Sequence, residues 1–558
     1  MSASKLSTAT EPADIAAGLT ALHKYACSGK SDPSRFEADV AALRTQFDIS
    51  VAIAARKLNS MVSLQSRLPD ELWCMAWQDL PLADRLSVTR ACHAWRTLAV
   101  GCPRVWSLID FYSEVHGSDC TCPECGDLDI LVRSGLVVRP PERTNFRLLD
   151  FALKRSGEAP LILHIADLLP LSNDDIYVEL STKLQPYAAR IVAIRMDLGD
   201  CYRVLPLLDR IHTGALPALR VLAISCVTCK DDDDYYAHRN FISKVFRNDI
   251  ALKSLEELRL PWCAYPARSW TSFRLPALQT ISLTVSDADD ILPLLLACPS
   301  LDVLHLTFAE DFDVGDDLSV PAHQAKILRL VRRLSDVCLT SVPEEFENVT
   351  LSSFAAPEVP LLSIGHKYED SAYRTLQALV SHFDATEGVT LSVTTINAGL
   401  DTVIGLTTRN GRRHEVCIAG TDSITSNTWT HIPGPLPTSV VLDANLWSQQ
   451  VRFKQLPRPM PNVTSVTFVN SQIWAWEYVD SVTHRALDAL LFPALETVHL
   501  KGRRSDRAIA SHKVVVILDV LRSPARGGPP VALYTHGIRI EGDMTELASR
   551  ATVHRLDG

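Results

Sequence analysis

Four side chains near residue 120 have the types and spacing that could bind a metal ion. They are His116, Cys120, Cys122 and Cys125. Three thiolates and one imidazole can complete the tetrahedral shell of a structural zinc ion, and Cys-Pro-Glu-Cys-Gly is typical of a zinc-knuckle turn. Only one Cys-x-x-Cys pair occurs here, so the alternative is a flexible insertion with exposed thiols. Neither interpretation requires a catalytic role.

None of the common catalytic motifs occurs in the chain. The sequence has no Gly-x-x-x-x-Gly-Lys phosphate loop, no Gly-x-Gly-x-x-Gly turn after a strand, no Gly-x-Ser-x-Gly elbow and no His-Glu-x-x-His pair. The 17 histidines are scattered. We therefore expect a protein that is not an enzyme and needs no cofactor.

A second group of polar side chains lies between leucines. Arg259 and His305 each separate the last two leucines of a Leu-x-x-Leu-x-Leu run. Because strand side chains alternate, inward-facing leucines place these residues on the opposite, concave face. Such a polar, mixed-charge face suits a protein ligand; the alternative is that it is merely solvated and the partner binds loops. The predicted substrate-binding residues are Glu257, Arg259, Ser282, His305, His499 and Lys501.

These residues belong to a repeated pattern that must position them. Leu-x-x-Leu-x-Leu units begin at Leu255, Leu278 and Leu301, so the columns advance by 23 residues twice. One strand-plus-helix unit cannot bury its own leucines, whereas stacked units form a parallel ladder with a continuous core. We therefore predict an α/β fold in which Leu258, Ile281 and Leu304 stack in one buried column.

The pattern is irregular and becomes indistinct between residues 385 and 450. Strand-like runs remain at 389–393, 416–418 and 440–442, and the segment 409–413 resembles a turn between two strands. Two interpretations stay open here. The segment is either a distorted part of the ladder or a small separate sheet.

Residues 68–106 read as two or three short amphipathic helices with more apolar surface than they can bury. Tryptophans 73, 77, 95 and 106 fall within this segment, which is too short for a substantial core of its own. It is preceded by a helical run containing Phe36, Val40, Leu43, Phe47 and Val51. We expect that helix to pack within the chain rather than against another copy, whereas the short helices require a partner.

The short helices resemble the F-box. The matching residues are Leu68-Pro69-Asp70-Glu71-Leu72, Leu80, Asp84-Arg85-Leu86, Cys92-His93-Ala94-Trp95-Arg96 and Pro103-Arg104-Val105-Trp106. Ala76 departs from the family pattern, which usually has a large aliphatic residue there. The resemblance implies docking onto the Skp-type adaptor of a cullin–RING ubiquitin ligase. The residues expected to form or support the docking face are Leu68, Pro69, Leu72, Leu80, Leu86 and Trp95.

The repeats resemble a leucine-rich repeat solenoid, and the whole chain resembles fungal-type F-box proteins with degenerate repeats. This implies an irregular right-handed solenoid with parallel strands inside and helices outside. It also implies the substrate-recognition subunit of an SCF-type ligase, with a repeat scaffold that lacks ligase activity as the alternative. The expected domains are a disordered tail at 1–33, a helix at 34–63, the F-box at 64–111, a Cys-containing insertion at 112–145 and the solenoid at 146–558.

Composition limits the partners and the compartment. The net charge of −10 argues against general nucleic-acid binding, which depends on a positive field along the phosphates. No apolar run approaches the ~18 residues of a membrane span, and residues 1–12 lack the apolar core of a secretory signal. We expect a protein of the cytoplasm or nucleus that binds an adaptor, through it a cullin, and a substrate protein.

Overall fold

The computed structural model is mixed α/β with one large, mostly parallel sheet. It describes residues 33–62, 68–114, 143–167, 174–198, 216–226, 253–264, 274–313, 320–396, 401–419, 435–444, 459–469, 491–502, 507–522 and 529–556, with residues 17, 20, 23, 24, 432 and 446. The chain divides into two compact units. The first comprises Met1–Leu108 with Arg155–Gly157, and the second comprises Ile109–Lys154 with Glu158–Gly558.

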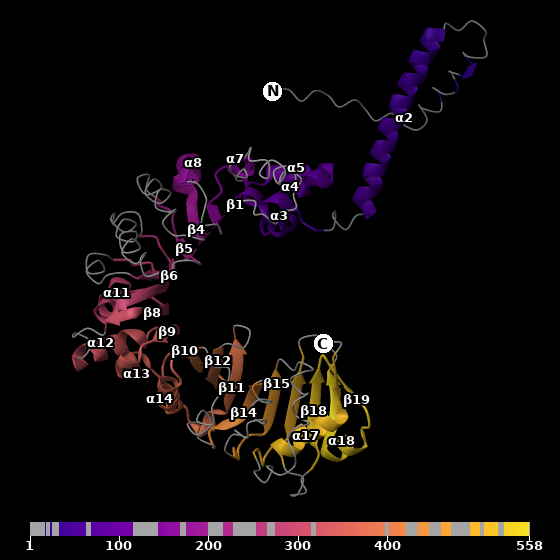
Figure 1. The fold of residues 1–558 in the computed structure, drawn as a ribbon. Helices are drawn as coiled ribbons and strands as arrows, with labels where there is room; N and C mark the ends of the chain where they lie inside the picture. Colours follow the sequence, from indigo (N-terminus) through magenta and orange to yellow (C-terminus); the bar gives the residue numbers. More distant parts are fainter. Residues whose placement is uncertain are drawn as a thin grey trace, which may run out of the picture. The chain divides into compact units, whose positions relative to one another are not determined.

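The described part of the first unit is helical (Figure 1). Its elements are α2 (Pro33–Val62), α3 (Asp70–Gln78), α4 (Leu82–Ala91), α5 (His93–Gly101) and the 3₁₀ turn η2 (Pro103–Trp106). Pro69 and Pro81 stand directly before α3 and α4, where the missing N–H costs nothing. The Cys92 side chain caps α5 by accepting a hydrogen bond from the Trp95 backbone N–H.

The core of α3 to η2 combines a tryptophan cluster with a buried arginine. The rings of Trp73, Trp77 and Trp95 lie 5.3–5.8 Å apart between centroids. Arg85 is fully buried and donates to the carbonyls of Leu80 at 2.6 Å and Val105 at 3.0 Å. These bonds tie α4 to the end of the segment, since a buried guanidinium needs such partners.

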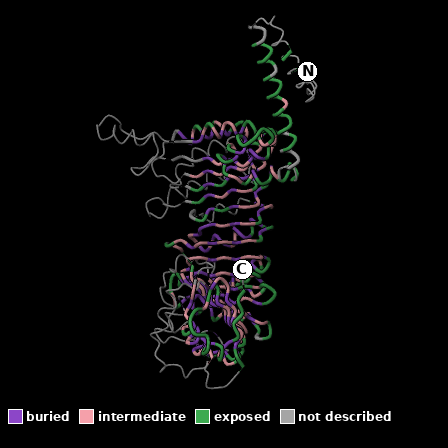
Figure 2. Tube along the Cα trace, turned by 90° about the vertical axis from the view of Figure 1, so that its right-hand side faces the viewer, coloured by how far each residue is buried: buried purple, intermediate pink, exposed green. Residues whose placement is uncertain are grey.

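Within the described part of the first unit, helix α2 does not bury its apolar side chains as expected. Except for the half-buried Ser50, each of its side chains that the structure describes is exposed (Figure 2). Phe47 and Ile49 are each 53% exposed. The predicted helix is confirmed, but the apolar side chains that the structure describes on it remain largely exposed.

In the second unit, eighteen of the described strands form one sheet. The first ten are β1 (Leu108–Glu114), β2 (Arg143–Thr144), β3 (Leu161–Asp167), β4 (Ile191–Leu198), β5 (Val221–Cys226), β6 (Glu257–Ala264), β7 (Thr280–Asp287), β8 (Val303–Asp313), β9 (Asp336–Val342) and β10 (Leu361–His366). Each strand from β3 to β9 pairs in parallel with the next, and the run ends at β10. At the start, β1 pairs with β3 and is antiparallel to β2.

The remaining strands extend the sheet to its C-terminal end. They are β11 (Val389–Ile396), β12 (Asp401–Thr407), β13 (Arg413–Ile418), β14 (Pro437–Asp443), β15 (Ser465–Val469), β16 (Thr497–Lys501), β18 (Val531–His536) and β20 (Ala551–Leu556). From β14 to β20 the pairing is again parallel in chain order. A separate pair joins β17 (Arg507–Ala510) to β19 (Ile538–Glu541).

Helices connect the strands. They are α7 (Phe146–Arg155), α8 (Asp174–Leu184), α11 (Ile291–Ala297), α12 (Pro321–Val331), α13 (Glu347–Phe354), α14 (Glu369–Val380), α17 (Ser511–Leu521) and α18 (Thr545–Arg550). Successive helices α11 to α14 contact one another and lie on one side of strands β8 to β10 (Figure 1). None of the described helices has the length and apolar character needed to cross a membrane.

The predicted leucine column is confirmed. Leu258 pairs with Ile281 and Ile281 with Leu304, and all three side chains are 0% exposed. The same column continues in register through Val337 and Leu362 toward the C-terminus. The repeated leucines thus bury one face of each strand against the helices, as the period-2 alternation requires.

The indistinct region 385–450 belongs to the ladder, so a small separate sheet is wrong. Here β11, β12 and β13 form an antiparallel meander. Across the sheet the strands follow one another as β10, β13, β12, β11 and β14, so the meander runs in the reverse of chain order. Both outer pairings, β10 with β13 and β11 with β14, are parallel. The predicted turn lies between β12 and β13, and the strand-like runs lie in β11, β13 and β14.

A histidine occupies a core position in this meander. His414 is in register with Leu362 on one side and Leu406 on the other, and it is 1% exposed. Its Nε2–H donates to the Val359 carbonyl at 2.9 Å, and its Nδ1 lies 3.3 Å from Nδ1 of His382. Burial lowers the pKa of His414 to about 4, so the ring is neutral near pH 7.

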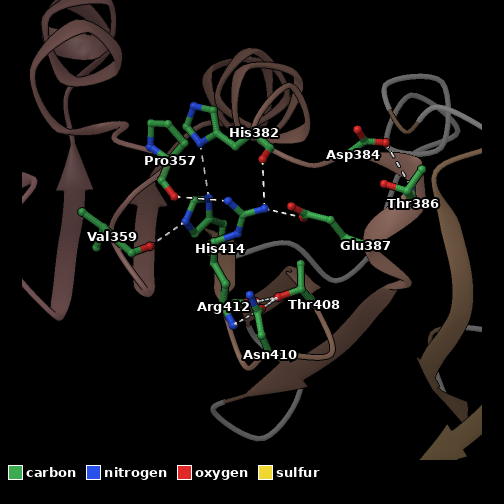
Figure 3. A network of polar contacts seen from close by, with 10 residues as sticks. All are labelled: Pro357, Val359, His382, Asp384, Thr386, Glu387, Thr408, Asn410, Arg412 and His414. Carbon is green, nitrogen blue, oxygen red and sulfur yellow. Dashed lines mark hydrogen bonds and ion pairs between the residues drawn. The ribbon is translucent and has the colours of Figure 1, made fainter.

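Arg412 fastens the turn of the meander to the preceding segment (Figure 3). Its guanidinium donates to the carbonyls of Pro357 at 3.3 Å and His382 at 3.1 Å, and it pairs with Glu387. The same group lies 4.7 Å from the centroid of the Phe383 ring. One arginine therefore joins three segments that are far apart in sequence.

Candidate functional site

The face of the ladder opposite the buried leucines presents one continuous column of mostly polar side chains. We call this column the open face. In ladder order, its members are His164, Arg195, Ala223, Arg259, Ser282, His305, Cys338, Ser363, Glu415, Gly405, Ser392, Val441, Thr467, His499, Tyr534 and His554. None of these side chains except Gly405 is buried.

The structure brings the predicted substrate-binding residues to one face. Arg259, Ser282, His305 and His499 are members of the open face. Glu257 stands two residues before Arg259 and Lys501 two residues after His499 on the same strands, so both share the orientation of the column. This placement bears out the alternation rule, while the binding role of these residues stays a prediction.

In the N-terminal half of the ladder, the open face pairs acidic side chains with an arginine and with two histidines. Glu257 Oε1 lies 2.6 Å from Arg259 Nε. His305 Nε2 lies 3.5 Å from Asp336 Oδ2, and His164 Nε2 lies 2.9 Å from Asp197 Oδ2. Because these groups remain partly exposed, the pairs contribute little to stability and can exchange partners with an incoming charged ligand.

In the C-terminal part, the open face becomes aromatic. The His499 ring stacks on Tyr534 at 4.8 Å, and Tyr534 stacks on His554 at 4.9 Å. His499 Nδ1 lies 3.4 Å from His536 Nε2, and burial followed by the charges of His536 and Lys501 lowers the pKa of His499. An aromatic stack of this kind provides a stacking surface for a planar group.

Sequence reasoning missed Tyr534 and His554. The strands that carry them do not contain the Leu-x-x-Leu-x-Leu frame. The available signal was the alternation of Val531, Leu533 and Thr535, of which all three are buried. That alternation is too short to separate a strand from other apolar runs.

The open face has no catalytic constellation among the described residues. Burial raises the pKa of Cys338, so its thiol is protonated near neutral pH and is a poor nucleophile. Within the described ranges, no group of three His, Cys, Asp or Glu side chains could hold a metal ion. The zinc candidates His116, Cys120, Cys122 and Cys125 lie outside those ranges.

A second candidate surface lies on α3 and the residues before it. Leu68 and Leu72 are 46% and 48% exposed, and Pro69 is also exposed. The other three predicted docking residues, Leu80, Leu86 and Trp95, are half-buried. Trp95 contacts Trp73 and Trp77, so it supports the surface from within.

Met75 extends this apolar surface and was not predicted. It is 61% exposed and lies one turn after Leu72 on α3. Ala76, the departure from the F-box pattern, is exposed beside it. We call Leu68, Pro69, Leu72 and Met75 the α3 surface.

Comparison of the chain with protein-family models and with curated proteins finds no match to either. Its function is therefore inferred from the two surfaces themselves.

Proposed function

We propose that this protein is the substrate-recognition subunit of an SCF-type cullin–RING ubiquitin ligase. In this proposal the α3 surface docks an Skp-type adaptor, which links the chain to a cullin, and the open face binds the substrate protein. The chain itself performs no chemistry. It holds a substrate near a ligase in the cytoplasm or nucleus.

The observation that carries the proposal is the exposure of apolar side chains at motif positions. Leu68 and Leu72 fall in the Leu-Pro-x-Glu-Leu match, yet they face outward while Cys74 and Trp77 of the same helix are buried. Burying a leucine against a partner stabilises a complex by roughly 1.5–3 kcal/mol. The residues that resemble the F-box opening thus supply surface that a partner can cover.

The ladder supports the second half of the proposal. We infer that it is an irregular leucine-rich repeat solenoid, right-handed, with its strands inside and its helices outside. A solenoid of stacked units provides an extended face for a polypeptide ligand. The paired charges and the aromatic stack of the open face offer both polar contacts and flat apolar anchors.

The test is adaptor capture by a double variant, Leu68→Ala with Pro69→Ala. Immobilised full-length protein should retain a purified Skp-type adaptor, and the double variant should lose most of that binding. The matched control is Leu296→Ala on α11, because Leu296 has a comparable exposure of 49%. Circular dichroism of each variant should match that of the wild type.

Two outcomes would count against the proposal. If the double variant captures the adaptor as well as the wild type does, the α3 surface is not the docking site. If the wild type captures no adaptor but still binds proteins through the open face, the chain is a repeat scaffold without ligase activity.

A further inference from the structure

Helix α2 exposes an apolar stripe along its length. Val40, Phe47, Val51 and Leu58 are 42%, 53%, 50% and 61% exposed, and Ala54 between them is also exposed. At 100° per residue these five positions fall on one side of the helix. In water such a stripe favours association with another apolar surface.

The spacing of the stripe is symmetric about Phe47. Counting outward from Phe47, the sequence places apolar residues four, seven and eleven positions away in both directions. The backward set is Leu43, Val40 and Phe36, and the forward set is Val51, Ala54 and Leu58. A second copy of the helix, turned to run antiparallel about Phe47, would therefore oppose every apolar position with an apolar position.

The charges beside the stripe fit the same arrangement. Asp39 and Lys57 lie on one flank of the stripe, and Arg44 and Asp48 lie on the other; all four side chains are exposed. In the antiparallel pair Asp39 comes within about 3 Å along the axis of the partner's Lys57, and Arg44 comes equally near the partner's Asp48. Each flank thus places opposite charges together.

A parallel pair fits worse. In register, it sets Glu37 of one helix beside the partner's Asp39, because these residues lie on opposite flanks at nearly the same height. It also aligns the two helix dipoles in the same direction, whereas the antiparallel pair opposes them.

We infer that α2 binds α2 of a second copy of this chain as an antiparallel pair centred on Phe47. The inference rests on residues of the first unit outside the α3 surface, so it does not depend on the proposed ligase function. If that function also holds, each dimer presents two open faces, and a substrate with two binding segments gains avidity.

The first test compares two glutamate substitutions of equally exposed residues. Phe47→Glu places two carboxylates at the centre of the pair and should convert the full-length dimer to a monomer in sedimentation velocity. Ile49, also 53% exposed, lies on the opposite side of α2, so Ile49→Glu should leave the dimer intact. A wild type that is monomeric at every concentration, or equal effects of the two substitutions, would overturn the inference.

The second test fixes the orientation through charge exchange. Asp39→Lys and Lys57→Asp should each raise the dimer dissociation constant by about five- to tenfold, because two like-charged pairs replace two attractive pairs. The double variant should return close to the wild-type value. In a parallel pair residues 39 and 57 lie 18 residues apart along the axis, so Lys57→Asp would not rescue Asp39→Lys, and a double variant without rescue would refute the antiparallel register.

Discussion

His414 occupies a core position in the register of the ladder, although its side chain is polar and titratable. Its neighbours in the column are leucines, and its own ring is buried with fixed partners on both nitrogens. The Val359 carbonyl accepts from Nε2–H, so Nδ1 is the acceptor that faces His382. The sequence around it, Arg412-Arg-His-Glu-Val416, contains no leucine frame, and a core histidine could not be predicted from that pattern.

Among the described residues, the two most buried histidines make the ladder sensitive to acid. Burial lowers the pKa of both His366 and His414 to about 4, from the ordinary value of 6.5. The unfolded chain therefore binds more protons between about pH 6.5 and 4, and the free energy of unfolding must fall as the pH is lowered through that range.

We predict that His414→Gln removes about 2 kcal/mol of the loss in unfolding free energy between pH 7 and pH 5. Urea unfolding at both pH values measures this difference. His512→Gln is the control, because His512 is exposed on α17. An unchanged pH dependence in His414→Gln would show that His414 is not the group responsible.

At the scale of elements, the positions of the strands were more predictable than the order in which the strands pair. The leucine columns and the helix at 34–63 follow from local periodicity, and the structure places them at the expected positions, with α2 spanning Pro33–Val62. The pairing of β10 with β13 does not follow from any local pattern. It depends on α14, which packs on both strands, and on Arg412, which binds Pro357, His382 and Glu387.

We predict that Leu304→Ala lowers the free energy of unfolding by about 2–5 kcal/mol, because the column cannot collapse around the lost methyl groups. Leu296→Ala, on the exposed side of α11, should change it by less than about 0.5 kcal/mol. Thermal or urea unfolding distinguishes the two. Equal effects would mean that the column does not carry the packing energy assigned to it.

At the scale of the molecule, the open face joins two chemically different regions on one sheet. Acidic side chains paired with arginine or histidine dominate from β3 to β9, and stacked aromatic rings dominate from β16 to β20. The charged region could be predicted because its residues lie between recognisable leucines. In the aromatic region His499 could be predicted in the same way, whereas Tyr534 and His554 could not, since β18 and β20 lack that frame.

We predict that Arg259→Glu with His305→Asp abolishes substrate capture while adaptor capture stays unchanged. The two substitutions place carboxylates beside Glu257 and Asp336 and alter the potential that a ligand meets. Lys326→Glu with Arg329→Asp on α12 is the control. Affinity capture followed by mass spectrometry should show the same proteins for control and wild type. Retention of every substrate by the Arg259/His305 variant would place the binding surface elsewhere.

The reversed strand order of the meander also determines when the strands can pair while the protein is being synthesised. Strands β3 to β10 can pair one after another as they leave the ribosome, because each neighbour comes next in the chain. The free edge of β10 must then wait for β13, which at about 5–20 residues per second takes a few seconds. An unpaired edge can recruit strands from other chains. The nascent protein is therefore most exposed to misassembly, and most dependent on chaperones, while residues 367–412 are being made.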